Sequence, residues 1–336
     1  MLEGGLDVAG GELINRTMAR LLERDPGAFI IGCGCTDNEG VYGTCLAAKE
    51  RFPDRVFDCP LSEKAVMGLA CGAAAEGMLP VVVHARADFL LLTMDPLCNH
   101  AAKWEGIFGV KMPLIVRAVI GYGWGQAGQH SQVPVGALCS FPGIRFSMPV
   151  RAEQYEDLFR ERPDGPLVIF EHRMIHRQGD MPKALPRFGE WTQVVDDWRE
   201  DDKARLLILT LGPTYRWWSK GLHLLRDRGF GHRILATDVA DPLLGIPHDL
   251  EYHATLIVDP GHALYGWADR MLAEMRLCQV FGDAVGLVAQ KQQPAPASPR
   301  LDFQHHPNPK NVLRAACHLM RIETPSYDCP EVLAAD

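Results

Sequence analysis

The feature that most constrains the fold of this chain is its alternation of short apolar runs with helix-patterned segments. The runs in the first half, rich in branched residues and bounded by Gly, Pro or charge, are AFIIG (28–32), MLPVVVHA (78–85), MPLIVRAVI (112–120) and PLVIFEHR (166–173). Such runs are typical of strands buried on both faces of a parallel sheet. Between them lie amphipathic stretches such as 11–25, which has a leucine-rich apolar face. The alternation predicts an α/β fold, in which helices flank a mostly parallel sheet.

The alternation is interrupted once. From residue 178 to 203 the sequence is dominated by prolines, tryptophans and acidic residues, and it ends WREDDK. Beyond it the pattern restarts with RLLILTLG (205–212), HRILATDV (232–239) and ATLIVDPG (254–261). We therefore predict two α/β domains, residues 1–178 and 204–336, joined by a linker at 179–203. A length of 336 residues suits two domains.

Composition excludes several functional classes. The net charge is −8, and no Lys/Arg cluster marks a surface for nucleic acid. No apolar run approaches the ~18 residues of a membrane span, and the first residues lack the basic start and apolar core of a secretion signal. Ten cysteines in 336 residues make no disulfide framework, and Cys33 and Cys35 lack a second pair at metal-ligand spacing. We expect a cytoplasmic protein with no metal site of its own and neither nucleic-acid nor membrane binding.

The segment FDCPLSEKAVMGLACGAAA (57–75) holds the first catalytic candidate. Pro60 cannot continue a helix, so Ser62 and Glu63 stand where a helix begins. Gly68 and Gly72 are four residues apart, share a helix face and allow close approach of another backbone. A carboxylate fixed at the start of a tightly packed helix is a candidate for catalysis. Helix capping explains Glu63 equally well at this point.

Two further elements compete for the site. The Gly-rich stretch 121–132, GYGWGQAGQHSQ, predicts a loop that presents Gln129 and His130, and such a histidine could donate or accept protons or simply lie at the surface. Phe89 follows a predicted strand, where parallel sheets present ligands, although its apolar context also suits the core. His305 and His306 lie in a proline-bounded loop and are expected at the surface. No dinucleotide fingerprint, phosphate-binding loop or nucleophile elbow is present.

Five segments taken together resemble one family. DCPLSE, DPLCNHAAK, PLIVRA, the loop ending GQHSQ, and FPGIRFSMP are similar, in this order, to the beta subunits of thiamine-diphosphate-dependent 2-oxo-acid dehydrogenases of the pyruvate, branched-chain and acetoin types. The resemblance covers about residues 12–178. It implies a pyrimidine-binding, transketolase-like domain, followed by a domain that resembles the transketolase C-terminal domain in architecture and length.

The resemblance also implies roles for residues. Glu63 matches the glutamate that hydrogen-bonds the aminopyrimidine of the cofactor, and Phe89 matches the aromatic residue that stacks on it. His130 matches the active-site histidine near the thiazolium, and the adjacent Gln129 is expected to contact the cofactor. The diphosphate and its Mg²⁺ are held in such enzymes by a GDG…N motif, which this chain lacks. An alpha-type subunit is therefore implied, with self-association to an α2β2 enzyme and acyl transfer to a lipoyl-bearing acyltransferase.

Departures from the family pattern leave alternatives open. Gly32-Cys33-Gly34-Cys35 stands where an acidic residue usually follows the first strand, and Val83-His84 stands where Glu-Phe is common. One alternative is a split transketolase-like enzyme that transfers an acyl or ketol unit to a non-lipoyl acceptor. Another is a non-catalytic partner subunit. The 2-oxo acid and the acyl acceptor are not specified by these residues.

Overall fold

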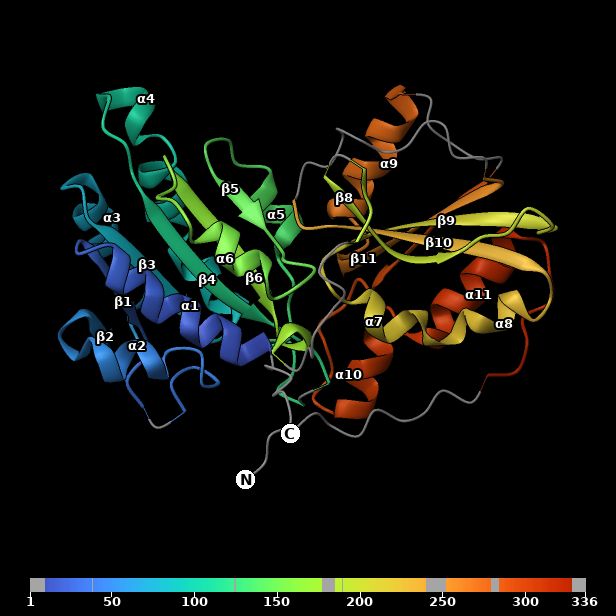
Figure 1. Cartoon of the computed structure of the whole chain (residues 1–336), viewed down its shortest axis with the longest axis horizontal. Coiled ribbons are helices and arrows are strands. Elements are labelled where there is room, and N and C mark those ends of the chain that lie inside the picture. The colour runs from blue at the N-terminus through green and yellow to red at the C-terminus, as the bar shows by residue number, and fades with distance from the viewer. Residues whose placement is uncertain are drawn as a thin grey trace. The chain divides into compact units, whose positions relative to one another are not determined.

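The computed structural model describes residues 10–37, 39–123, 125–176, 185–188, 190–239, 252–278 and 284–327. The chain divides into two compact units. Unit 1 comprises Met1–Ile120 and Phe141–Pro182, and unit 2 comprises Gly121–Ser140 and Lys183–Asp336. Each unit is built on its own six-stranded sheet (Figure 1). The predicted α/β fold class is therefore confirmed.

The sheet of unit 1 is wholly parallel, in the order β2-β1-β3-β4-β6-β5. Its strands are β1 (Ala28–Gly32), β2 (Val56–Asp58), β3 (Leu79–His84), β4 (Leu114–Ile120), β5 (Arg145–Ser147) and β6 (Pro166–His172). Every residue of β1, β3, β4 and β6 is buried, as expected for strands covered on both faces. The carboxyl ends of β1, β3, β4 and β6 consequently meet at one edge, where α/β proteins bind ligands.

Helices flank this sheet. They are α1 (Gly10–Arg24), α2 (Leu46–Arg51), α3 (Glu63–Ala75), α4 (Trp104–Phe108) and α6 (Gln154–Leu158), together with the 3-10 helices η1 (Pro53–Arg55), η2 (Ala87–Thr93) and η4 (Arg173–Ile175) and the π-helix η3 (Asp95–Ala101). Figure 1 shows α1 and α6 in front of the strands. Apolar residues of α1, α2 and α6 share one core cluster with β1, β3, β4 and β6. The segment after η2 is not one continuous helix but η3 followed by α4.

The sheet of unit 2 is mixed, in the order β12-β11-β9-β10-β8-β7. Strands β9 (Ala204–Leu211), β10 (Phe230–Thr237), β11 (Ala254–His262) and β12 (Ala284–Gln290) are parallel, whereas β7 (Arg187–Phe188) and β8 (Trp191–Asp197) pair antiparallel. The helices are α5 (Val135–Cys139), α7 (Tyr215–Trp218), the 3-10 helix η5 (Ser219–Gly221), α8 (His223–Arg226), α9 (Trp267–Cys278), α10 (Pro299–His305) and α11 (Pro309–Leu319).

The observed units differ from the predicted domain ranges in two places. Strands β7 and β8 lie inside 179–203, the predicted linker, and extend the sheet of unit 2. The Gly-rich loop and α5, residues 121–140, belong to unit 2 although they lie within the range 1–178. The boundaries at 178 and 204 stay a prediction of where independent domains begin and end.

The expectation for His305 and His306 was wrong. His305 is 2% exposed and His306 is fully buried, because residues 299–305 form α10 rather than a surface loop. The ring of His306 stacks on Tyr122, and its Nε2 lies 3.2 Å from a carboxylate oxygen of Asp302. His306 therefore helps to attach the start of the Gly-rich loop to the rest of unit 2.

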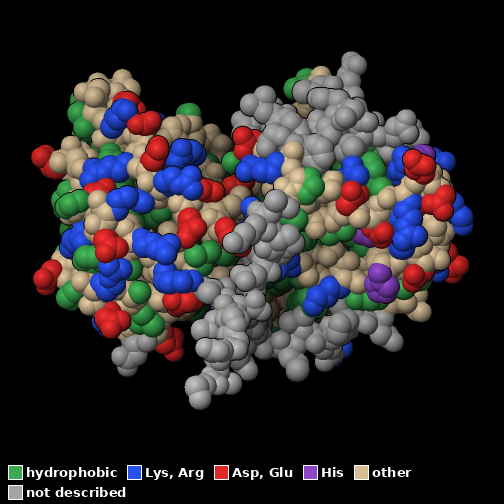
Figure 2. Space-filling view, in the orientation of Figure 1, with side chains coloured by type: hydrophobic (Ala, Val, Ile, Leu, Met, Phe, Trp, Pro, Cys, Tyr) green, Lys and Arg blue, Asp and Glu red, His purple; other side chains and the backbone are tan. Residues whose placement is uncertain are grey.

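The surface carries no obvious charged face in the view of Figure 2, where Lys/Arg and Asp/Glu side chains are interspersed. Within the residues that the structure describes, no helix has both the length and the apolar character needed to cross a membrane.

Candidate active site

A pocket lies at the carboxyl edge of the unit 1 sheet. It encloses about 420 Å³, part of it open to solvent. The ends of β1 and β3 form its floor, and the start of α3 and the helix η2 form its walls. Its lining residues are Gly32, Cys33, Cys59, Pro60, Leu61, Ser62, Glu63, Val66, Val82, Val83, His84, Ala85 and Phe89. The structure thus brings together two of the predicted site residues, Glu63 and Phe89.

Glu63 is the first residue of α3 and is partly buried. The helix N-terminus carries a partial positive charge at this point. Ser62 occupies the N-cap position, but no side-chain hydrogen bond caps the helix. Among the described residues, none donates a hydrogen bond to the Glu63 carboxylate. The capping interpretation therefore lacks the bond that would support it, and the carboxylate is available to a ligand.

The opposite wall combines an aromatic ring with a buried histidine. Phe89 lies in η2, directly after β3, and is partly buried. His84 ends β3 and is only 4% exposed. Burial lowers the pKa of His84 to about 4, so the ring is neutral at pH 7. Its Nε2 has no hydrogen-bond partner among the described atoms. A buried polar atom without a partner is costly, and one that lines a pocket can be satisfied by a ligand.

Backbone geometry at Gly32 shapes the floor. A Cβ atom there would lie 2.3 Å from the carbonyl oxygen of Val83, so any larger residue would push β1 away from β3. Asp58 holds the segments that follow β1 and β2. Its carboxylate accepts hydrogen bonds from Gly34 N (2.8 Å) and Cys59 N (3.0 Å). A glycine and a carboxylate therefore position the entrance of the pocket.

The cysteines at the pocket are not thiolates at neutral pH. Burial, together with the charges of Asp58 and Glu63, raises the pKa of Cys33. Burial and neighbouring negative charge likewise raise the pKa of Cys59 to about 11. Neither thiol is therefore an activated nucleophile. No group of three or more His, Cys, Asp or Glu side chains able to hold a metal occurs in the described ranges.

Gln129 and His130 lie in unit 2. The ring of His130 is partly buried, and its Nδ1 lies 3.2 Å from the carbonyl oxygen of Gln126, whereas Gln129 is exposed. At the start of the loop, Gly123 N donates to a carboxylate oxygen of Asp302 (2.8 Å). The loop is thus fixed to unit 2, while Glu63 and Phe89 belong to unit 1. A shared site for all four residues stays a prediction.

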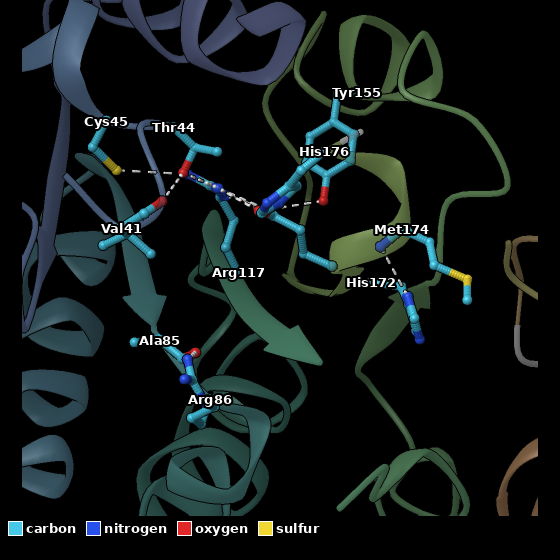
Figure 3. Close-up of polar contacts among 11 residues, drawn as sticks. Val41, Thr44, Cys45, Ala85, Arg86, Arg117, Tyr155, His172, Met174 and His176 are labelled. Carbon is cyan, nitrogen blue, oxygen red and sulfur yellow. Dashed lines mark hydrogen bonds and ion pairs between the residues drawn. The ribbon is translucent and has the colours of Figure 1, made fainter. Parts of the chain in front are cut away.

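Unit 1 also holds a buried polar cluster that the sequence did not reveal (Figure 3). Arg117 on β4 and Glu171 on β6 are fully buried and form a salt bridge of 2.7 Å. Glu171 also accepts a hydrogen bond from Tyr155 Oη (2.9 Å) and lies 2.6 Å from His176 Nε2. Burial alone would raise the pKa of Glu171, but Arg117 and His176 hold it at about 2.

The same arginine reaches the loop after β1. Arg117 Nη2 donates to Thr44 Oγ1 (2.8 Å), and Thr44 Oγ1 in turn donates to the carbonyl of Val41 (2.8 Å). The cluster therefore joins the middle of β4 and the end of β6 to the loop after β1. In the sequence its only trace is a charged residue inside each of two apolar runs, PLIVRAVI and PLVIFEH.

Comparison with known proteins supports the resemblance seen in the sequence. Residues 7–178 match the family "Transketolase, pyrimidine binding domain". The beta subunit of the acetoin:2,6-dichlorophenolindophenol oxidoreductase of Cupriavidus necator is 28% identical over 332 residues, which cover 92% of this chain and 96% of that protein. The predicted similarity to beta subunits of this kind is confirmed.

Two further relatives match over a shorter range. The beta subunit of the pyruvate dehydrogenase E1 component of Rickettsia conorii is 32% identical over 52% of this chain and 55% of its own length. The 2-oxoisovalerate dehydrogenase subunit beta of Bacillus subtilis is 31% identical over 51% of this chain and 54% of its own length. The chain thus spans about half the length of these two relatives.

A solved structure shares the architecture of the chain. "Split gene transketolase, inactive beta4 tetramer" aligns with a TM-score of 0.71 over 94% of this chain and 99% of that chain. At 15% sequence identity, this likeness shows the fold alone.

Proposed function

Because this chain belongs to the family of proteins with a transketolase-type pyrimidine-binding domain, we propose that it is the beta-type subunit of a thiamine-diphosphate-dependent 2-oxo-acid dehydrogenase. The reaction is the oxidative decarboxylation of a 2-oxo acid with transfer of the acyl group to lipoyl. The observation that carries the proposal is the meeting of Glu63 and Phe89 in one pocket at the carboxyl edge of the sheet.

The residues present fit the aminopyrimidine part of the cofactor. A flat heteroaromatic ring needs an apolar slot, an aromatic neighbour and few polar partners. The pocket offers Val66, Val82, Phe89, one carboxylate and the unsatisfied Nε2 of His84. When bound, thiamine diphosphate supplies a nucleophilic ring carbon and an electron sink for decarboxylation.

Glu63 has the central chemical role in this proposal. With the cofactor bound, the Glu63 carboxyl group would share a proton with a ring nitrogen of the aminopyrimidine, which would favour loss of a proton from the cofactor. Two observations support this role: Glu63 lines the pocket at the start of α3, and it accepts no hydrogen bond from any residue in the described ranges. Phe89 holds the ring plane by stacking. His84, neutral at pH 7, donates or accepts one further hydrogen bond.

His130 handles a proton during acyl transfer, and Gln129 contacts the cofactor. His130 Nδ1 lies 3.2 Å from the carbonyl oxygen of Gln126, a contact that orients the ring within the loop. Glycines with positive φ at Gly123 (+79°) and Gly125 (+68°) give the loop a backbone path that other residues rarely adopt. The proposal requires this loop to meet the Glu63 pocket in the working enzyme.

An alpha-type subunit completes the site. The chain lacks the GDG…N motif, so the partner is expected to bind the diphosphate and Mg²⁺. A lipoyl-bearing acyltransferase receives the product. We place the complex in the cytoplasm, where thiols such as the free Cys33, Cys59 and Cys71 stay reduced.

Self-association through α3 gives the α2β2 assembly. The close packing expected around Gly68 and Gly72 does not come from this chain, because a Cβ at either position would meet no described atom within 4 Å. The open face forms a groove lined by Lys64, Gly68, Cys71, Gly72, Ala75, Asp95, Pro96, His100, Trp104 and Met112. Exposed apolar side chains, including Leu69 (56%) and Phe108 (58%), support its burial by another chain.

The experiment replaces Glu63 in the complex reconstituted with its alpha-type partner. Glu63→Gln keeps the shape of the side chain but cannot share the proton in the same way. We expect decarboxylation to fall by about 10²-fold or more, the usual contribution of a general acid–base group. Glu76→Gln, an exposed glutamate at the other end of α3, is the matched control and should leave the rate unchanged. Equal rates for Glu63→Gln and the control would refute the proposal.

A further inference from the structure

Two arginines that the proposed reaction does not use converge on one tyrosine at the carboxyl edge of unit 1. The guanidinium carbon of Arg173 lies 4.5 Å from the ring centroid of Tyr42, and that of Arg86 lies 5.4 Å from it. The three residues come from three elements: the loop after β1, the residues after β3, and η4 after β6. Residues far apart in the sequence therefore form one cationic cluster.

The loop that carries Tyr42 has an unusual backbone. Val41 and Tyr42 both adopt positive φ, +50° and +57°, which costs a non-glycine residue about 1 kcal/mol or more. The hydrogen bonds from Arg117 to Thr44 and from Thr44 to the Val41 carbonyl hold this conformation (Figure 3). The fold thus stabilises a strained segment that places the Tyr42 ring beside the guanidinium groups of Arg86 and Arg173.

Electrostatics favour an anion at this cluster. Burial, followed by the positive charge of Arg173, lowers the pKa of Arg86 to about 10, while Asp88 acts in the opposite direction. Both guanidinium groups remain charged at pH 7, so two positive charges lie together beside the carboxylate of Asp88. Arginine forks bind phosphate and carboxylate oxygens bidentately, which makes such an anion the ligand that suits the pair.

The cluster adjoins the pocket of Glu63 without being part of it. Arg86 follows Ala85 and precedes Phe89, both of which line the pocket, and its Nη1 donates to the Ala85 carbonyl at 2.7 Å (Figure 3). A substrate that reacts on a cofactor held in this pocket could therefore extend a second group to the arginines.

We propose that Arg86 and Arg173, positioned by Tyr42, bind an anionic group of the substrate, a phosphate ester or a carboxylate, remote from its reacting carbonyl. This inference rests on the proposed function for the reacting carbonyl, and it narrows the substrate to one with a second negative group. Short, uncharged aliphatic 2-oxo acids would leave the two arginines without this ligand.

The test measures binding of inorganic phosphate to the full chain by calorimetry, in the absence of thiamine diphosphate. We expect saturable binding that weakens about 10-fold in Arg173→Gln and in Arg86→Gln, the loss typical of one charge-assisted hydrogen bond. Arg173→Lys, which keeps the charge but not the fork, should lose less. The control is Arg160→Gln, an exposed arginine paired with Asp157 on the surface, and it should bind like the wild type. Absence of saturable binding at millimolar phosphate, or equal binding by all variants, overturns the proposal.

Two further measurements distinguish a phosphate ester from a carboxylate as the ligand, and a substrate site from a cofactor site. Displacement of phosphate by glycerol phosphate identifies a phosphate ester, and stronger displacement by succinate identifies a carboxylate. If Arg173→Gln weakens thiamine diphosphate binding by the reconstituted complex as much as it weakens phosphate binding, the arginines hold the cofactor and the proposal is wrong. Phosphate binding that depends on both arginines, in a complex that binds no thiamine diphosphate, would uphold the anion site and refute the proposed function.

Discussion

The buried pair of Arg117 and Glu171 gives the most quantitative expectation for stability. Both side chains are fully buried, and the salt bridge joins neighbouring parallel strands. Replacing only Glu171 by Leu leaves the guanidinium charged in the core. Removal of one partner of such a pair costs about 3–5 kcal/mol, whereas replacing both partners with apolar side chains is far less harmful. We therefore expect Glu171→Leu to be much less stable than the double variant Arg117→Met/Glu171→Leu.

The lowered pKa of Glu171 gives a second value for the free energy that this ion pair contributes to folding. Folding lowers the pKa of Glu171 from its ordinary 4.5 to about 2. At ~1.36 kcal/mol per tenfold change in proton affinity, this corresponds to about 3 kcal/mol, in line with the mutational expectation. Because the pKa is depressed, this contribution is fully present above pH 4.5 and is lost as the pH falls towards 2. The apolar double variant should lack this part of the acid sensitivity.

The assay is amide hydrogen exchange, followed by mass spectrometry, of peptides covering β4 and β6. It reports on the sheet of unit 1 even when the two units unfold separately. Glu171→Leu should exchange far faster in both strands, and the double variant should recover most of the protection. Equal protection in wild type and Glu171→Leu would show that an unpaired buried Arg117 does not destabilise the sheet. A double variant less protected than the single one would show the same.

Three further perturbations follow from particular contacts. Gly72→Leu should leave the isolated chain folded, since the new side chain meets no described neighbour, but abolish self-association in analytical ultracentrifugation; unchanged association would contradict the assigned interface. His130→Ala should spare decarboxylation with an artificial electron acceptor more than acyl transfer to lipoyl, and equal losses would assign His130 to substrate binding or decarboxylation. Asn308 accepts hydrogen bonds from Lys310 N and Asn311 N at 3.1 Å, so Asn308→Ala should destabilise α11 by about 1 kcal/mol in urea unfolding; an unchanged midpoint would argue against the cap.

Much of the fold could be predicted because its signals are local. The fully buried strands of unit 1 appear in the sequence as continuous branched apolar runs, and Pro60 and Ser62 mark the start of α3. The start of α3 in turn placed Glu63 at the pocket. Strand β8 was missed because WTQVVDD mixes polar and apolar residues, as suits its antiparallel place near the edge of a sheet.

The rest depends on contacts between distant segments. Nothing in the sequence pairs Arg117 with Glu171, 54 residues away, or brings Arg86 and Arg173 to the ring of Tyr42. Each of these side chains stands alone in its own segment, and only the parallel arrangement of β3, β4 and β6 places them at one edge. The burial of His305 and His306 was likewise not predicted, because the prolines around them indicate a surface loop and not the packing of α10.

The most direct test of the proposed function is an experimental structure of the chain with its alpha-type partner and thiamine diphosphate. We expect a Glu63 carboxylate oxygen within hydrogen-bonding distance, about 2.6–3.2 Å, of a ring nitrogen of the aminopyrimidine. We also expect the ring to stack on Phe89 and the Gly-rich loop to bring His130 to the same site. An aminopyrimidine bound elsewhere, with Glu63 facing solvent, would refute the proposed function.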